Sequence, residues 1–208
     1  RTALFTNQTT SNLTAVGYAA LYANTTGTNG VAVGKDALQA NTTGNNNTAV
    51  GLEALQSNTT GDQNTAIGTG ALASNTTADN NTACGRAALG LCTTGSQNCA
   101  VGSLALDACT TGNYNNAMGA YALTEVTTGD SNVAVGQQVM QAVTTGSNNT
   151  GMGYAAGLDV TTGSNNTFLG MNSGRSGSPS GSITTGSNNF VLGNNSISNL
   201  YCADTSIS

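Results

Sequence analysis

Glycine returns every seventeen residues through most of this chain of 208 residues. A version of Asn-Thr-Ala-Val-Gly contains each of these glycines, and Thr-Thr-Gly or a near copy ends seven residues earlier. Self-similarity at a fixed short period is typical of repeat proteins, in which each unit packs against the next. We therefore predict a structure that extends in one direction. The ten repeat positions are Gly17, Gly34, Gly51, Gly68, Gly85, Gly102, Gly119, Gly136, Gly153 and Gly170.

The repeat unit is too short for a helix. A strand and two turns would leave about six of the seventeen residues, whereas isolated helices need roughly 12–15 residues. Each unit instead offers two short apolar segments, Asn-Thr-Ala-Val-Gly and Ala-Leu, separated by turn-forming Asn, Thr and Gly. We predict an all-β fold, a parallel β-solenoid or β-roll of 17-residue coils with two short strands in each coil.

The first predicted strand is apolar on both faces. The residue before the repeat glycine is Val, Ile, Leu, Met or Cys, and the residue before that is Ala in eight successive units, from Ala15 to Ala134. Neighbouring strand residues point to opposite faces, so we expect burial on both sides. We predict that the medium-sized residues and the Leu of Ala-Leu fill a thin interior, while Ala faces outward against another chain.

The turns contain two further regular positions. The glycine of Thr-Thr-Gly, from Gly27 to Gly163, is predicted to need a positive φ, and Ala78 replaces it in one unit. Asn stands four residues before the repeat glycine in eight units, from Asn47 to Asn166. Stacked at one coil spacing, these amides would form a hydrogen-bonded Asn ladder; a turn residue in the left-handed region is the alternative.

Composition narrows the function classes. Charged residues make up 6% of the chain, and the formal net charge is −5. The four cations, Arg1, Lys35, Arg86 and Arg175, are too few and too scattered for a nucleic-acid surface. No apolar run approaches the roughly 18 residues that cross a bilayer, so we expect no membrane insertion. The chain begins at Arg1 in mid-repeat, so we expect it to be part of a longer protein.

Catalytic chemistry has little support in the sequence. Histidine is absent, which excludes Ser-His-Asp and Cys-His nucleophiles. Asp62 and Asp79 occupy the same position in adjacent units, where they could form an acid pair or bind a cation; we favour the alternative of a solvated turn residue. We predict no catalytic residue, no cofactor and no metal site, and therefore no enzyme.

The cysteines are odd in number, five, and two of them share a repeat position. Cys92 and Cys109 are seventeen residues apart, so neighbouring coils would place them about 4.8 Å apart, within the Cα range of a disulfide. In-register side chains run parallel and do not converge, so we favour small apolar fillers. A bonded pair remains the alternative.

The seventeen-residue interval breaks once. After Gly170 the next strand glycine is Gly193, and the six additional residues fall in a Gly/Ser-rich segment without Ala-Leu. Because loops on rigid scaffolds often carry binding residues, we predict a receptor-contact loop at Arg175, Ser178 and Pro179. A tolerated flexible insertion is the alternative.

The break divides the chain into three predicted parts. Residues 1–170 form regular repeats, residues 171–187 form a coil with the inserted loop, and residues 188–208 form a last coil and a C-terminal tip.

The unit Asn-Asn-Thr-Ala-Val-Gly-x-x-Ala-Leu with Thr-Thr-Gly, as in residues 43–55, closely resembles the repeats of phage tail-fibre proteins. It is also similar to the head repeats of trimeric autotransporter adhesins, which carry a shorter Ala-x-Gly-x-x-Ala version. The resemblance covers about residues 8–193. It implies a homotrimer of left-handed parallel β-rolls, and both the handedness and the number of chains come from the resemblance alone.

The segment 188–202 resembles the part of many phage fibres that precedes an intramolecular chaperone domain, which trimerises the fibre and then cuts itself off. Under this resemblance an end at Ser208 fits such a cut, and an end of another origin is the alternative. The resemblance implies a non-enzymatic fibre segment of the virion, outside the cell, that serves attachment to a host glycan or protein. A bacterial surface adhesin head is the alternative, and a glycan-cleaving tailspike using Asp62 or Asp79 is a remote one.

Overall fold

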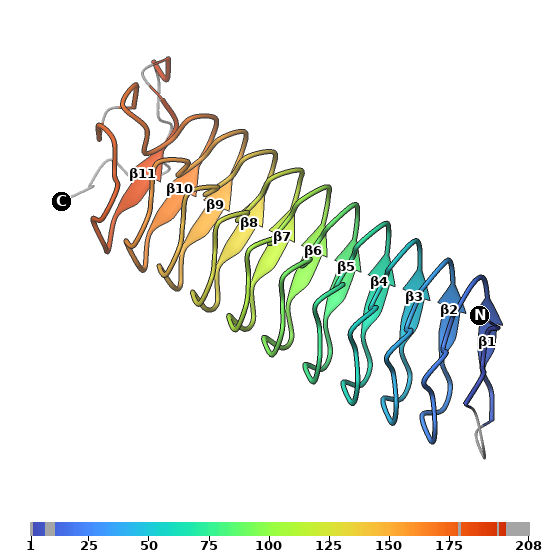
Figure 1. The fold of residues 1–208 in the computed structure, drawn as a ribbon. Coiled ribbons are helices and arrows are strands. Elements are labelled where there is room, and N and C mark those ends of the chain that lie inside the picture. Colours follow the sequence, from blue (N-terminus) through green and yellow to red (C-terminus); the bar gives the residue numbers. More distant parts are fainter. Residues whose placement is uncertain (1, 7–10, 179, 195, 199–208) are drawn as a thin grey trace.

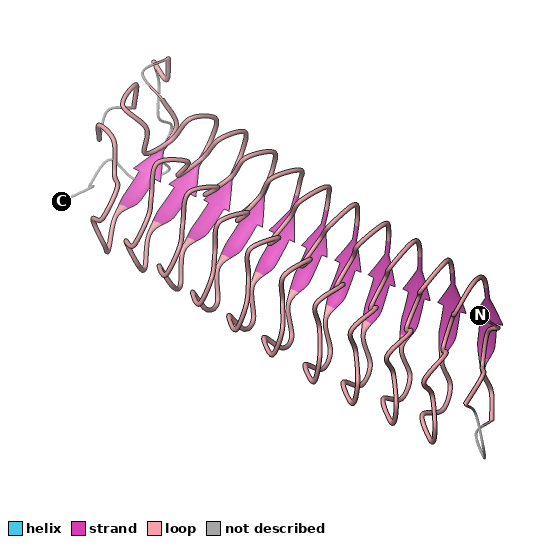
Figure 2. Ribbon diagram, viewed as in Figure 1, coloured by secondary structure: helices cyan, strands magenta, loops and turns pink. Residues whose placement is uncertain are grey.

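The protein is a stack of short coils with one strand in each coil (Figure 1). A computed structural model of the chain describes residues 2–6, 11–178, 180–194 and 196–198. Within these residues there are eleven strands of three residues and no helix (Figure 2). The strands are β1 (Thr14–Val16), β2 (Val31–Val33), β3 (Thr48–Val50), β4 (Thr65–Ile67), β5 (Thr82–Cys84), β6 (Cys99–Val101), β7 (Asn116–Met118), β8 (Val133–Val135), β9 (Thr150–Met152), β10 (Thr167–Leu169) and β11 (Phe190–Leu192).

The strands form one parallel sheet in which sequence order equals spatial order. Each residue pairs with its counterpart one repeat later, as Ala49 pairs with Ala66. Only the pairing of β10 with β11 spans twenty-three residues, with Thr167 opposite Phe190. The predicted parallel β-solenoid of 17-residue coils is therefore confirmed. Ten steps of about 4.8 Å give a rod of about 50 Å, with β1 and β11 at opposite ends of the stack (Figure 1).

The predicted second strand does not form. The Ala-Leu segments are turns, because residues two and four positions after the strand glycine take positive φ, as at Asp36 (58°) and Leu38 (49°). Hydrogen bonds between coils persist there nonetheless: the Leu38 N–H donates to the Ala54 carbonyl, and the Ala40 N–H donates to the Gln56 carbonyl, both at 3.0 Å. Residues with positive φ at alternate positions turn the chain, while the hydrogen bonds to the neighbouring coils are kept.

The strand faces are oriented opposite to the prediction. The central Ala of each strand from β2 to β8 is fully buried, whereas the medium-sized residue after it points outward; Val16 is 58% exposed and Met118 is 52% exposed. The interior is too thin for the larger residue, because buried Ala and Leu of the turns already face the strand. At Gly151, a strand-centre glycine, an added Cβ would lie 2.5 Å from Cγ1 of Val139 on that opposing wall.

The repeat glycines are required by both backbone conformation and space. Gly51 has a φ of 141°, and an added Cβ would lie 2.5 Å from the carbonyl oxygen of Gly68 in the next coil. The Thr-Thr-Gly glycines were predicted to need a positive φ, and this is wrong. Gly44 does not have a positive φ; its Cβ would instead lie 2.5 Å from the Gly61 carbonyl oxygen. Close approach between coils, not turn handedness, selects glycine there.

Buried asparagines run along the stack in two ladders. In the predicted ladder the Asn47 side-chain oxygen accepts the Asn64 backbone N–H at 2.9 Å, and the same contact recurs up the stack. The left-handed alternative is wrong, because the residue before each ladder Asn has the positive φ, as at Asn46 (57°). A second ladder, seven residues after the repeat glycine, consists of Asn24, Asn41, Asn58 and Asn75.

Candidate functional site

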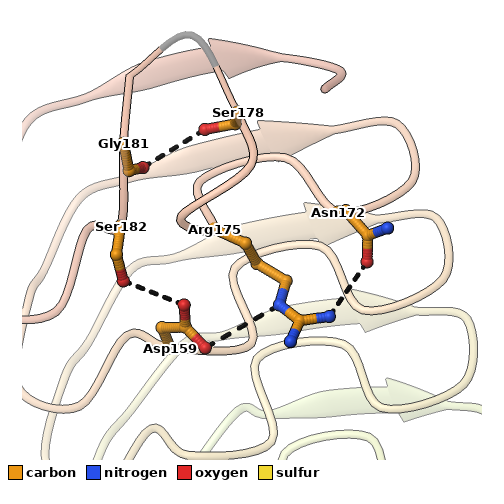
Figure 3. Close-up of polar contacts among 6 residues, drawn as sticks. All are labelled: Asp159, Asn172, Arg175, Ser178, Gly181 and Ser182. Atoms are coloured by element: carbon orange, nitrogen blue, oxygen red, sulfur yellow. Dashed lines mark hydrogen bonds and ion pairs between the residues drawn. The ribbon is translucent and has the colours of Figure 1, made fainter. Parts of the chain in front are cut away.

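The interrupted coil between β10 and β11 is the main departure from regular stacking. Its additional residues rise out of the stack at the C-terminal end as a loop (Figures 1 and 3). Short hydrogen bonds close it: the Ser178 N–H donates to the Arg175 carbonyl at 2.8 Å, and the Ile183 N–H donates to the Gly174 carbonyl at 2.9 Å. The loop therefore has internal order and is anchored on the coil beneath.

Arg175 lies at the base of this loop between two partners (Figure 3). One guanidinium nitrogen, Nη1, donates to Oδ1 of Asn172 at 3.1 Å. The Nε atom lies 3.8 Å from Oδ1 of Asp159, too far for a hydrogen bond, and it is buried without a hydrogen-bond partner. The other oxygen of Asp159 accepts the Ser182 hydroxyl at 2.8 Å. The guanidinium is positioned, yet most of its donors are unused.

A cavity of about 170 Å³ opens beside Arg175. Among the residues that the structure describes, its walls are Asn172, Arg175, Ser176, Gly177 and Asn194, and none of these carries a carboxylate. The predicted loop residues thus separate in role. Arg175 faces this cavity, whereas Ser178 is buried and its hydroxyl bonds within the loop, to the Gly181 carbonyl at 3.2 Å. Pro179 lies outside the described residues.

An apolar stripe runs along the sheet and is formed by the third residue of every strand. The two flanking residues of a strand share a face, and here that face is open while the central residue is buried. The sequence showed both apolar faces but not which of them points outward. The stripe comprises Val16, Val33, Val50, Ile67, Cys84, Val101, Met118, Val135, Met152, Leu169 and Leu192.

The described cysteines are all free thiols. Cys92 and Cys109 are fully buried, and each Sγ contacts the carbonyl oxygen three residues later, that of Gly95 at 3.2 Å and that of Gly112 at 3.5 Å. The Cys92 thiol and burial raise the pKa of Cys109, which keeps it protonated. The prediction of small buried fillers is confirmed for this pair. Cys84 is exposed on the apolar stripe, and Cys202 lies outside the described residues.

Asp62 and Asp79 have a structural role. Oδ1 of Asp62 accepts the Asn45 backbone N–H at 2.6 Å, and Oδ1 of Asp79 accepts the Asp62 N–H at 2.7 Å. Ser96 provides the same acceptor in the next coil. This column accepts hydrogen bonds from one coil to the next, and in the part of the chain that the structure describes no three metal-ligating side chains gather.

Comparisons with protein-family models, with curated proteins and with solved structures found no match. No helix able to span a membrane occurs among the described residues. The fold and the surface chemistry are therefore the grounds for assigning a function.

Proposed function

We propose that this chain is a segment of a phage tail fibre, a non-enzymatic rod of the virion that projects toward a host surface and attaches to it. The observation that carries the proposal is the combination of eleven parallel strands in register with an apolar stripe along the whole sheet. Repeats that stack in one direction give length and stiffness. Apolar surface that is continuous over such a length is typical of an interaction surface.

The partners that best fit the stripe are parallel copies of the same chain, in a homotrimer. Parallel copies in register present stripes with the same coil spacing, so each row meets its counterpart along the full rod. Cyclic symmetry closes such an assembly and leaves no stripe exposed. The Asn and Thr columns of the turns then remain in contact with water. The sequence predicted that outward Ala residues make the contact between chains. In the proposed trimer the outward Val, Ile and Met residues make this contact instead.

The solution mass tests this proposal. Light scattering coupled to gel filtration is expected to give three chains per particle, and small-angle scattering is expected to give a rod. The stripe residue Cys84 provides an independent readout: because copies in register bring their Cys84 thiols together, mild oxidation should give a covalent dimer on a non-reducing gel.

A pair of variants separates the stripe from general surface effects. Ile67→Asp with Val101→Asp places charges on the stripe and should leave single chains. The matched control, Thr60→Asp with Thr94→Asp, adds the same charge to exposed turn positions and should leave the trimer intact. A wild-type protein that is monomeric at micromolar concentration would contradict the proposal.

A further inference from the structure

The cavity beside Arg175 is lined by a guanidinium and two side-chain amides that have unused hydrogen-bond donors. Oδ1 of Asn172 already accepts from Arg175, and Oδ1 of Asn194 accepts the Ser196 N–H at 3.0 Å. Both side chains therefore offer their Nδ2 groups, and the guanidinium adds further N–H donors. Unused donors, with no carboxylate among the described lining residues, select a ligand that is rich in acceptors and carries negative charge.

Arg175 differs from the other described cations in how it is used. Lys35 forms a close pair with Asp36 at 2.8 Å and is exposed at the regular part of the rod. The Nε atom of Arg175 is buried 3.8 Å from Asp159, so the remaining N–H groups of Nη1 and Nη2 are the ones that can reach a ligand. A guanidinium fork matches a carboxylate in planar, two-pronged geometry. The fixed orientation removes part of the entropy that binding would otherwise cost.

The size of the cavity limits the ligand. A volume of about 170 Å³ holds about five or six waters at roughly 30 Å³ each. Typical ligand pockets of about 300–1,000 Å³ are larger. One sugar ring with its substituents matches the smaller space, with its carboxylate at Arg175 and its hydroxyl groups at the two Asn amides.

We propose that the Arg175 cavity binds a single carboxylated sugar residue of a host-surface glycan. This inference rests on the proposed attachment function and specifies its ligand. The site belongs to the inserted loop and its neighbouring coil, so it occurs once per chain, at the end of the rod where the seventeen-residue interval breaks. A homotrimer would carry three such sites, and a glycan with several acidic residues would gain avidity from them.

Titration by NMR or calorimetry of the full chain with glucuronate tests the proposal. A ligand of this size is expected to bind with a Kd on the order of millimolar, and glucose and inorganic sulfate are expected to bind at least about tenfold more weakly. Arg175→Gln should lower the affinity for glucuronate at least about tenfold, because a two-pronged charged contact is lost. Arg175→Lys keeps the positive charge but lacks the two-pronged guanidinium, so its affinity for glucuronate should lie between those of the wild type and Arg175→Gln.

Arg86→Gln is the matched control, since Arg86 is an exposed arginine of the regular coils. Three results would each overturn the assignment of an acidic sugar. The first is that Arg86→Gln loses as much affinity for glucuronate as Arg175→Gln. The others are that the wild type binds glucose, or sulfate, as tightly as glucuronate. The thermal midpoint of each variant shows whether folding is unchanged. If the wild-type protein forms a trimeric rod but does not bind glucuronate, this inference fails while the proposed fibre function stands; a monomer that binds glucuronate would give the opposite result.

Discussion

The coils of β2 to β7 and those of β9 to β11 build the same interior from different residues. In the first region every strand centre is Ala and every turn contributes Leu four residues after the glycine. In the second region the strand centre is Gly151 in β9 and Phe168 in β10, and the Leu position is occupied by Gly157 and Gly174. The sheet continues through both regions in register.

The substitutions in the second region compensate for one another across coils. An added Cβ at Gly174 would lie 2.5 Å from Cε1 of Phe168, and one at Gly157 would lie 2.7 Å from its Cδ2. One phenylalanine therefore fills the space that two leucines fill elsewhere, and it is fully buried. Protein interiors are packed to a nearly constant density, so interior volume is conserved between neighbouring coils even where the repeat sequence is not.

The largest expected effect comes from removing this phenylalanine. Phe168→Ala restores the repeat residue at the strand centre, yet it should destabilise the protein by about 3–5 kcal/mol, because Gly157 and Gly174 leave the cavity unfilled. The free energy of unfolding from urea denaturation measures the loss.

The matching rescue combines Phe168→Ala with Gly157→Leu and Gly174→Leu. Leucine takes a φ near 50° at this position in the regular coils, so the backbone accepts it. The triple variant should recover most of the lost stability. If the triple variant is no more stable than Phe168→Ala alone, the two glycines are not there to make room for the phenylalanine of the neighbouring coil.

The same glycine substitution should cost more in the first region than in the second. Gly51→Ala would place a Cβ 2.5 Å from a backbone oxygen at a φ of 141° and should cost about 2–4 kcal/mol. Gly170→Ala has a φ of 99° and its nearest atom at 3.1 Å, so we expect a smaller loss. As a control, Gly70→Ala meets no atom within 4 Å and should cost about 1 kcal/mol at most. Equal losses in thermal unfolding at all three positions would contradict this order.

The buried column seven residues after the repeat glycine also changes character along the rod. It begins with asparagines and continues with Cys92, Cys109, Val126, Val143 and Val160. The polar ladder ends at Asn75, whose Oδ1 is buried without a partner because the next residue in the column is Cys92, which donates to a carbonyl instead.

Two asparagine-to-valine substitutions test this boundary. Asn58→Val deprives the Asn41 side-chain oxygen of its donor and the Asn75 amide of one acceptor, while the Asn75 oxygen remains unpaired, so it should cost about 1–3 kcal/mol. Asn75→Val deprives the Asn58 oxygen of its donor but removes the unpaired oxygen, so its cost should be under about 1 kcal/mol. The free energy of unfolding of both variants is measured by urea denaturation. An equal loss in the two variants would show that the unpaired oxygen at the end of the ladder does not destabilise the protein.

The smallest expected effect is a pH dependence within the regular coils. Burial raises the pKa of the Asp107 carboxyl, Arg86 opposes this shift and Glu125 adds to it. Because the folded-state pKa lies above the unfolded one, the folded protein binds more protons in this range, so the contribution of Asp107 favours folding as pH falls through its pKa and is lost above it. Asp107→Asn should raise the thermal midpoint slightly at pH 7, and the difference from wild type should vanish near pH 3. A difference that does not change with pH would contradict this cause.

Much of the fold was predictable from the periodicity. A glycine every seventeen residues predicted parallel coils in register, and the single break in that interval located the inserted loop and Arg175. The asparagine ladder was one of two alternatives that equal positions in successive units offered for its column, and the buried Cys92–Cys109 pair followed from the same equality of position. The cavity beside Arg175 was not predictable, because Asn172 and Asn194 come from different coils and meet only after stacking.

The sequence alone determined the period, the position of the one strand that forms in each coil and the chemical character of each column, because these depend on residues close in the chain. Only the tertiary structure decided which strand face is inside. The alternation of side chains along a strand places Ala and Val on opposite faces, but it does not say which face points inward. The direction is decided by the opposing wall of Ala and Leu, which leaves room for one methyl group and so directs Ala inward and Val outward, where it forms the apolar stripe.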